Sequence, residues 1–259
     1  MNIVVCIKQV PEIALVRVDS SEGVILPEGH GSMNPFDEYA VEEGLRIKEK
    51  HGGTVTVLSC GGDSSIACLR DALALGADRA ILLTDAAFTG SDGVALGAIL
   101  AAAVKKIGGV DICLFGKNAV DTDRSVVPGA TAGKLGWPQV LFVKKFASVE
   151  NGAVQAIRMT EDGSDTVTAP LPAVFSVVKE INEPRLPSLK GKMKSKSAPV
   201  DKWSATDLSI DPNTVGPNSA VKRVGITPPP ARQKGQILAG DPASVAATLY
   251  EKLREEKVI

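Results

Sequence analysis

Short apolar runs alternate with longer stretches of helical periodicity along the first two thirds of the chain. The apolar runs predict buried strands at residues 3–7, 54–59, 80–83, 111–115, 140–143 and 173–178. Helical patterns lie between them at residues 35–50, 64–75, 91–107 and 126–135. Because strands that are apolar on both faces alternate with helices, the pattern predicts an α/β fold with a mostly parallel sheet and helices on both faces. Residues 153–168 alternate between apolar and polar side chains, which predicts an antiparallel hairpin at the sheet edge.

The composition changes near residue 183. From Pro184 to Lys234 the chain is rich in proline and lysine and has almost no apolar periodicity, so it cannot bury enough surface to fold as a separate domain. A last helix is predicted after Asp241, with an apolar stripe at Val245, Leu249 and Leu253. A helix at the end of such an arm favours docking on a second polypeptide, and folding back on its own domain is the alternative.

Charge and composition exclude several classes of function. The 29 Lys and Arg against 30 Asp and Glu leave a net charge of −1, which predicts no attraction to nucleic acid or to an anionic membrane. The apolar runs are too short and too rich in alanine and glycine to form a membrane span. The N-terminus is typical of a strand rather than a signal peptide, so a cytoplasmic protein is expected, with a matured organellar protein as the alternative. Four cysteines without a Cys-x-x-Cys pair and two histidines predict no metal site, disulfide framework or catalytic triad.

Three loops lie where ligands bind in parallel sheets, beyond the carboxyl ends of strands. The first follows the first strand at Cys6. In the second, Asn34 fits a helix N-cap, Pro35 the first helical position and Asp37 a capping box, and a well-capped helix is the alternative interpretation. The third, around Cys60, is a glycine turn that incompletely resembles the Ser-Gly-Gly-x-Asp-Ser loop of ATP pyrophosphatases.

The segment richest in polar chemistry is residues 116–139, which follows the fourth parallel strand. It places Asp121, Asp123, Arg124 and the hydroxyls of Thr122 and Ser125 before a Gly-Ala-Thr-Ala-Gly run at the start of a helix, and this run adds the hydroxyl of Thr131. Small residues allow the backbone to approach a phosphate, and a helix N-terminus favours its negative charge. We therefore predict that this segment binds a nucleotide.

These stretches, together with others, resemble one known family. CIKQVP near the start, SMNPFDEYAVEE, DALALGADRA, GKNAVDTD, TAGKLGWPQ and NEPRLPSL occur in the order and spacing of the beta subunit of electron transfer flavoprotein. The resemblance covers nearly the whole chain. It implies an adenine nucleotide alpha hydrolase-like fold, with a domain at residues 1–182, a partner-recognition loop at 183–200, and a C-terminal arm at 201–259 that docks on the alpha subunit.

The resemblance also implies a function and cofactors. Members of the family are heterodimers that carry electrons from acyl-CoA dehydrogenases or related dehydrogenases to a quinone-linked oxidoreductase or another acceptor, so the chain is expected to be a carrier subunit rather than a free-standing catalyst. The redox-active FAD lies mainly on the alpha subunit. The beta subunit holds AMP in ordinary members, and a second FAD in electron-bifurcating members, which take electrons from NADH.

The nucleotide contacts of the family fall on the loops selected above. They are Cys6, Asn34, Pro35, Phe36, Asp37, Cys60, Asp121, Thr122, Asp123, Arg124, Ser125, Val126, Val127, Pro128, Gly129, Ala130, Thr131 and Ala132. Bifurcating relatives read Asp-Gly-Asp-Thr-Ala-Gln-Val-Gly where this chain reads Asp-Thr-Asp-Arg-Ser-Val-Val-Pro, and the Trp-Pro-Gln that begins at residue 137 resembles ordinary members. The sequence therefore favours AMP over a second FAD. The Arg124 side chain is expected either to pair with the phosphate or to cap a solvated loop.

The recognition loop of the family, which docks on acyl-CoA dehydrogenases, corresponds to residues 183–196. The partner-binding residues are expected to be Glu183, Pro184, Arg185, Leu189, Lys192, Met193, Lys194 and Lys196. Alternating lysines from position 190 to 196 would share one side of an extended chain and steer the partner, with Leu189 as an apolar anchor. A nucleic-acid site and a plain solvated loop are the alternatives.

A second class of function competes with electron transfer. An ATP-using enzyme of the pyrophosphatase type, or a nucleotide-sensing stress protein, is expected to share this kind of fold. However, the glycine loop near Cys60 follows the second strand rather than the first. Such proteins also do not require a C-terminal arm that docks on a second polypeptide. We therefore favour the electron carrier.

Overall fold

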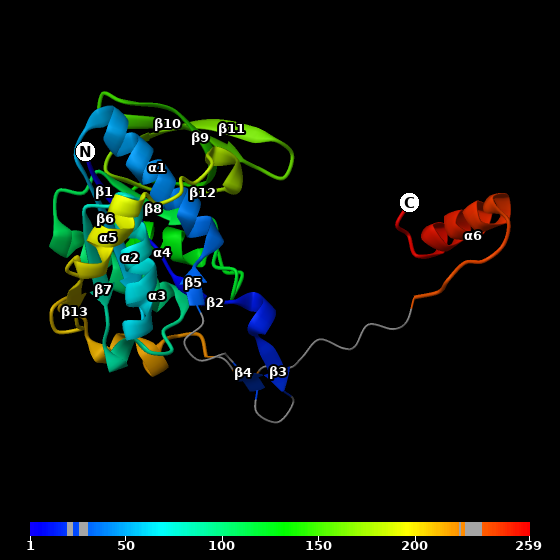
Figure 1. The fold of residues 1–259 in the computed structure, drawn as a ribbon, viewed down its shortest axis with the longest axis horizontal. Helices are drawn as coiled ribbons and strands as arrows, with labels where there is room; N and C mark the ends of the chain where they lie inside the picture. The colour runs from blue at the N-terminus through cyan, green and yellow to red at the C-terminus, as the bar shows by residue number, and fades with distance from the viewer. Residues whose placement is uncertain (20–22, 26–30, 223, 226–234) are drawn as a thin grey trace. The chain divides into compact units, whose positions relative to one another are not determined.

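The computed structural model describes residues 1–19, 23–25, 31–222, 224–225 and 235–259. The chain divides into two compact units, Met1–Ile226 and Thr227–Ile259. Figure 1 shows the elements of both, and each unit is considered by itself.

The first unit is built on a nine-stranded sheet in the order β11-β10-β9-β12-β8-β1-β6-β7-β13. Every neighbouring pair from β9–β12 to β7–β13 is parallel, and the hairpin β10–β11 adds two antiparallel strands beyond β9. The strands are β1 (Asn2–Cys6), β6 (Thr54–Cys60), β7 (Arg79–Leu83), β8 (Ile112–Gly116), β9 (Gln139–Glu150), β10 (Ala153–Met159), β11 (Ser164–Pro170), β12 (Ala173–Val177) and β13 (Asp201–Trp203). The predicted mostly parallel α/β fold is thus confirmed.

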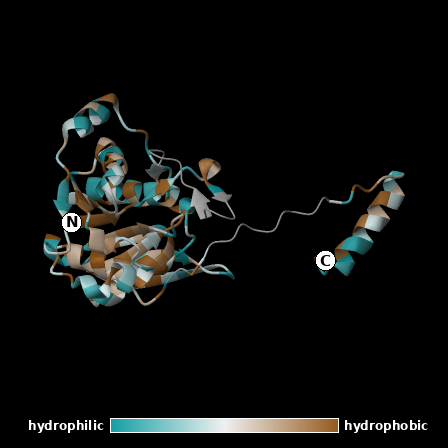
Figure 2. Ribbon diagram, turned by 90° about the horizontal axis from the view of Figure 1, so that it is seen from below, coloured by the Kyte–Doolittle hydropathy of each residue, from teal (hydrophilic) through white to brown (hydrophobic). Residues whose placement is uncertain are grey.

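Helices cover both faces of the sheet, as the apolar strands require. On one face, α1 (Pro35–His51) and α2 (Ile66–Leu75) bury their apolar side chains against one set of strand residues. On the other face, α3 (Gly93–Ile107) and α4 (Val126–Leu135) do the same. Figure 2 shows the hydrophobic strands between more hydrophilic helices. The observed helices differ from the predicted ones by at most two residues at either end.

The strand β9 is much longer than the predicted run at residues 140–143. Its first half pairs with β12 in parallel, and its second half continues to Glu150 and pairs antiparallel with β10. The predicted hairpin at residues 153–168 is confirmed as β10 and β11. Two small antiparallel pairs lie outside the main sheet, β2 (Gln9–Pro11) with β5 (Gly31–Met33), and β3 (Arg17–Asp19) with β4 (Gly23–Ile25).

The part of the chain after residue 182 differs from the sequence expectation. The expected arm was to start at residue 201, but the compact unit continues to Ile226, and β13 forms the ninth strand of its sheet. The side chains of Ala205, Leu208 and Val215 are buried. A three-residue edge strand and a few scattered apolar side chains suffice here because they complete an existing core rather than build a new one.

Residues 190–196 are helical, so the expectation of an extended chain with four lysines on one side was wrong. They belong to α5 (Leu189–Ser197), whose N-terminus is capped because the Ser188 hydroxyl accepts a hydrogen bond from Gly191 N–H at 3.0 Å. At 100° per residue, Lys190 and Lys194 share one side of the helix, and Lys192 and Lys196 point to another. α5 packs on α2, where Gly191 allows the backbones to approach: a Cβ at this position would lie 2.2 Å from the carbonyl oxygen of Ala74.

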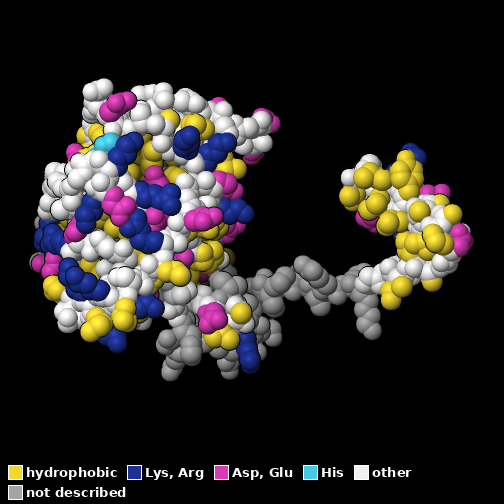
Figure 3. Space-filling model, turned by 45° about the horizontal axis from the view of Figure 1, so that its top comes forward, with side chains coloured by type: hydrophobic (Ala, Val, Ile, Leu, Met, Phe, Trp, Pro, Cys, Tyr) yellow, Lys and Arg dark blue, Asp and Glu magenta, His cyan; other side chains and the backbone are white. Residues whose placement is uncertain are grey.

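The second unit contains α6 (Pro242–Glu255), which begins at the predicted cap. The Asp241 carboxylate accepts hydrogen bonds from Ala243 N–H and Ser244 N–H, both at 3.1 Å. No residue of α6 is buried, and Leu249 and Tyr250 are about half exposed. Figure 3 shows hydrophobic side chains gathered on the visible face of this helix. Across the described residues, every helix is too short or too polar to cross a bilayer.

Candidate functional site

A pocket opens at the carboxyl ends of the central strands, between β1 and β8. The chain runs from β1 outward to β6 and β7 and then returns to β8 on the other side of β1, so this is the point where the strand order reverses and where open α/β sheets bind ligands. The space within the pocket amounts to about 570 Å³, part of which is open to solvent. It is lined by Cys6, Ile7, Lys8, Asn34, Asp37, Cys60, Leu96, Leu100, Phe115, Gly116, Asn118, Ala119, Arg124, Val127 and Pro128.

The buried Asn34 joins three loops of the pocket. Its backbone N–H donates to the carbonyl of Lys8 at 2.8 Å. Its side-chain amide donates to the carbonyl of Asn118 at 2.8 Å and accepts from Val120 N–H at 3.1 Å. Its side chain therefore does not cap α1 as the sequence suggested, because the side-chain amide bonds to the loop after β8, while the backbone N–H of the same residue bonds to the loop after β1.

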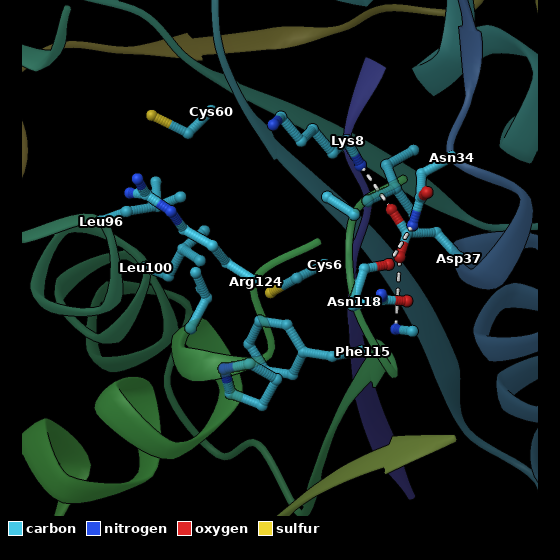
Figure 4. A pocket seen from close by; sticks show the side chains of 15 residues that line it. Cys6, Lys8, Asn34, Asp37, Cys60, Leu96, Leu100, Phe115, Asn118 and Arg124 are labelled. Atoms are coloured by element: carbon cyan, nitrogen blue, oxygen red, sulfur yellow. Dashed lines mark hydrogen bonds between the residues drawn. The ribbon is translucent and has the colours of Figure 1, made fainter. Parts of the chain in front are cut away.

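Asp37 is a buried carboxyl beside these loops. It accepts hydrogen bonds from Lys8 N–H at 2.7 Å and Gly116 N–H at 3.2 Å. Burial raises the pKa of Asp37 to about 7, although hydrogen bonds from Asn34, Lys8 and Gly116 and the charge of Lys8 oppose the shift. Gly116 is required here, because a Cβ would lie 2.5 Å from an oxygen of Asp37. Figure 4 shows Lys8, Asn34, Asp37 and Asn118 grouped along one side of the pocket.

Two cationic side chains line the pocket, and the loop at residues 117–125 carries one of them. Lys8 Nζ forms a salt bridge with Asp121 at 2.5 Å. The loop is closed on itself by an isolated bridge between Ala119 and Arg124 and by a hydrogen bond from the Asn118 amide to Asp123, which adopts a left-handed backbone conformation. This geometry presents Arg124 at the pocket, across from Lys8.

The start of α4 also borders the pocket. Ser125 occupies the N-cap position without a side-chain hydrogen bond to the helix, and Val127 and Pro128 line the pocket. α4 is held against α3 by close packing, because a Cβ on Gly97 would lie 2.6 Å from that of Ala130. A helix N-terminus flanked by two cations favours an anion such as a phosphate.

The remaining lining of the pocket is apolar, and its thiols are not ionised. Phe115, Leu96 and Leu100 form one wall, with the thiols of Cys6 and Cys60 beside them. Burial raises the pKa of the Cys60 thiol to about 12 and holds the pKa of Cys6 well above its ordinary value, so both stay neutral at physiological pH. This side of the pocket suits a flat apolar group rather than nucleophilic chemistry.

The structure separates the nucleotide residues expected from the sequence into two groups. Seven line the pocket: Cys6, Asn34, Asp37, Cys60, Arg124, Val127 and Pro128. The others lie outside its lining: Pro35, Phe36, Asp121, Thr122, Asp123, Ser125, Val126, Gly129, Ala130, Thr131 and Ala132. The Thr131 hydroxyl, for example, donates to the carbonyl of Val127 within α4 at 2.9 Å.

Sequence reasoning missed several lining residues. Lys8 could have been found, because it directly follows a predicted central strand, and Gly116 lies in the segment at residues 116–139 but was not singled out. Leu96 and Leu100 could not have been recognised as pocket residues from the sequence, since they lie in an ordinary apolar helix. Phe36 instead lines a second pocket beside the hairpin strand β10, where Lys117 Nζ lies 4.6 Å from the centre of its ring.

The expected partner-binding residues lie together on and before α5. Leu189 and Met193 are 77% and 68% exposed, and Leu186, which the sequence did not single out, is 92% exposed. Lys192, Lys194 and Lys196 surround them on α5. Arg185 instead points at α1, where it pairs with Glu42 and Glu49.

Comparisons with known proteins identify the family of this chain. Residues 22–208 match the electron transfer flavoprotein domain. The chain is 38% identical to electron transfer flavoprotein subunit beta of Thermoanaerobacterium thermosaccharolyticum, and 37% identical to caffeyl-CoA reductase-Etf complex subunit CarD of Acetobacterium woodii, in both cases over 100% of each chain. It is 39% identical to protein FixA of Azorhizobium caulinodans over 82% of this chain and 78% of FixA. The chain therefore belongs to the electron transfer flavoprotein family, among its beta subunits.

Proposed function

We propose that this chain pairs with an electron transfer flavoprotein alpha subunit. The heterodimer carries electrons from acyl-CoA dehydrogenases to a quinone-linked or other acceptor, and AMP binds in the pocket between β1 and β8. The observation that carries the nucleotide assignment is the pocket itself. It combines an apolar wall, two cationic side chains and a helix N-terminus at the point where the strand order reverses.

The residues present fit an adenine nucleotide. Asn118 Oδ1 is buried without a hydrogen-bond partner, and such an acceptor is satisfied by a donor such as an exocyclic amine. The apolar wall of Phe115, Leu96 and Leu100 suits a flat base, and Lys8 and Arg124 suit a phosphate. Lys8 would then exchange its salt bridge with Asp121 for the phosphate.

The first turn of α4 favours AMP over a second FAD. Val126, Val127 and Pro128 offer no side-chain donors, and Pro128 lacks a backbone N–H. A pyrophosphate requires more donors than a single phosphate, so this turn is better matched to a monophosphate. In this role the nucleotide stabilises the folded subunit and the redox chemistry is supplied by the FAD of the alpha subunit.

An electron-bifurcating subunit with a second FAD, and NADH as donor, is the alternative. The observation that favours it is the wide second pocket, which Phe36 and Lys117 help to line. The next residues in the sequence, Asp37 and Asn118, line the first pocket, so the two pockets are adjacent along both segments. A larger ligand would have room beyond the first pocket in this direction.

Two other features support the heterodimer and its partner. α6 exposes Leu249 and Tyr250 along a helix with no buried residue, as expected of a segment that docks on the alpha subunit. The exposed Leu189 and Met193 on α5, surrounded by lysines, suit a small interface with an apolar centre and a charged rim, and we assign them to docking of the dehydrogenase.

Cofactor counting tests the proposal. The heterodimer is purified and denatured, and the released FAD and AMP are counted per dimer. One FAD and one AMP are expected. Two FAD would replace the proposed function by the bifurcating alternative, and a colourless homodimer that hydrolyses ATP would exclude an electron carrier.

A further inference from the structure

The segment between β12 and α5 is tied to α1 by polar contacts. The Asn182 amide donates to the carbonyl of Tyr39 and to Glu43 Oε2, both at 3.0 Å. Arg46 reaches the carbonyl of Glu183 at 3.3 Å. The stretch from residue 182 to the start of α5 therefore follows α1 although it has no regular secondary structure of its own.

Arg185 makes the strongest of these contacts. Its Nε and Nη2 donate to the two oxygens of Glu42 at 2.7 and 3.2 Å. Its Nη1 and Nη2 donate to the two oxygens of Glu49 at 2.5 and 3.1 Å. The guanidinium thus engages two carboxylates at once, which the planar fork of arginine allows and the point charge of lysine does not.

The geometry of α1 accounts for this double contact. Glu42 and Glu49 are seven residues apart, or about two helical turns, so they lie on the same side of α1. The side chain of Glu42 is only 4% exposed and also accepts from Arg46 Nε at 2.7 Å and from Arg185 N–H at 3.2 Å. Burial alone would raise the pKa of Glu42, but the hydrogen bonds from Arg185 and Arg46 outweigh it and hold the pKa below its ordinary value.

The exposed leucines lie directly beyond this contact. Leu186 follows Arg185, and Leu189 begins α5 three residues later. At 92% and 77% exposure, neither side chain is fixed in place by its own burial. Their position must therefore be set by neighbouring contacts, namely the Arg185 contacts on one side and the packing of Gly191 on α2 on the other.

We propose that Arg185 is a positioning residue for partner docking, which holds Leu186 and Leu189 outward through its paired contacts with Glu42 and Glu49. The inference rests on the proposed role of this surface in docking a dehydrogenase. A segment held in its bound position before contact loses less conformational entropy on binding, so its affinity is higher. If the released segment occupies that position about a tenth of the time, the apparent Kd rises about tenfold.

The test uses the purified heterodimer with Arg185→Met, which keeps the apolar stem but removes the charge, and with Arg185→Lys. Hydrogen exchange at the backbone amides of residues 185–192 is measured first. We expect exchange about tenfold faster in Arg185→Met and an intermediate rate in Arg185→Lys. Lys48→Met is the matched control, because Lys48 lies on α1 next to Glu49 but pairs with Asp78 rather than with the Arg185 segment, so its variant should leave these amides unchanged.

Flavin reduction by limiting acyl-CoA dehydrogenase is measured next, with Leu189→Ala in parallel. Arg185→Met should raise the dehydrogenase concentration needed for half-maximal reduction about tenfold, and the double variant with Leu189→Ala should be little worse than the worse single variant. Unchanged exchange in Arg185→Met, or faster exchange with unchanged reduction while Leu189→Ala is impaired, overturns the positioning role alone. Wild-type reduction by Leu189→Ala overturns the docking surface, and the positioning role with it.

Discussion

Replacing Asp37 with Asn should change how the stability of the domain depends on pH. Asp37 is 6% exposed, and its pKa is raised from an ordinary value of 3.8 to about 7, mainly by burial. Between these two values the folded state retains a proton that the unfolded chain releases. The wild-type domain must therefore lose stability as the pH rises from about 4 to 7, whereas the neutral amide that the variant carries at this position contributes no such dependence.

The size of the effect follows from the shift. A pKa raised by this much lowers the free energy of unfolding by about 4 kcal/mol when Asp37 goes from fully protonated to fully ionised in both states. About 2.5 kcal/mol of this loss falls between pH 5 and pH 8. The variant also loses about 1–2 kcal/mol of stability at every pH. The NH₂ group of Asn is a donor and cannot accept a hydrogen bond, so either Lys8 N–H or Gly116 N–H would lose its acceptor. The pH-dependent part is therefore the quantity that tests the structure.

Urea unfolding followed by tryptophan fluorescence is a suitable assay, since both tryptophans lie in the first unit. The difference in unfolding free energy between Asp37→Asn and wild type should move by about 2.5 kcal/mol in favour of the variant from pH 5 to pH 8. Asp92→Asn is the control: backbone hydrogen bonds from Ala95 and Val221 lower the pKa of Asp92, so its contribution changes only in more acidic solution. A constant difference for Asp37→Asn across this range would refute the reasoning.

Three further predictions address α5 and the C-terminal unit. Gly191→Ala should destabilise the domain by about 1–3 kcal/mol, because its Cβ would collide with the carbonyl of Ala74, whereas Gly133→Ala in α4 meets open space and should be neutral or slightly stabilising in the same urea assay. Deleting residues 228–259 should leave the melting temperature of the domain unchanged but abolish co-purification with the alpha subunit, and an intact heterodimer would contradict this role of α6. Leu189→Ala should weaken dehydrogenase binding by about 2 kcal/mol, or some 30-fold, with the flavin content unchanged, and saturation of flavin reduction at the wild-type dehydrogenase concentration would contradict it.

The sequence alone determined the parts of this protein that depend on short-range patterns. Strands and helices of the α/β domain were predicted where apolar periodicity was strong, and α4 matches its predicted bounds because a continuous helical pattern ends at a glycine with a left-handed conformation. Loops that line the pocket were selected by residue chemistry at strand ends, and the family was identified by motifs in a specific order. All of these are properties of neighbouring residues, so they are visible without a fold.

Only the tertiary structure decided which distant segments meet. The addition of β13 to β7 and the pairing of Arg185 with two carboxylates of α1 each join residues more than 100 positions apart. β13 has three residues and α5 has almost no apolar face, so neither leaves a periodic signal. They form because an existing sheet edge and helix surface supply their partners, and that surface exists only after the rest of the chain has folded.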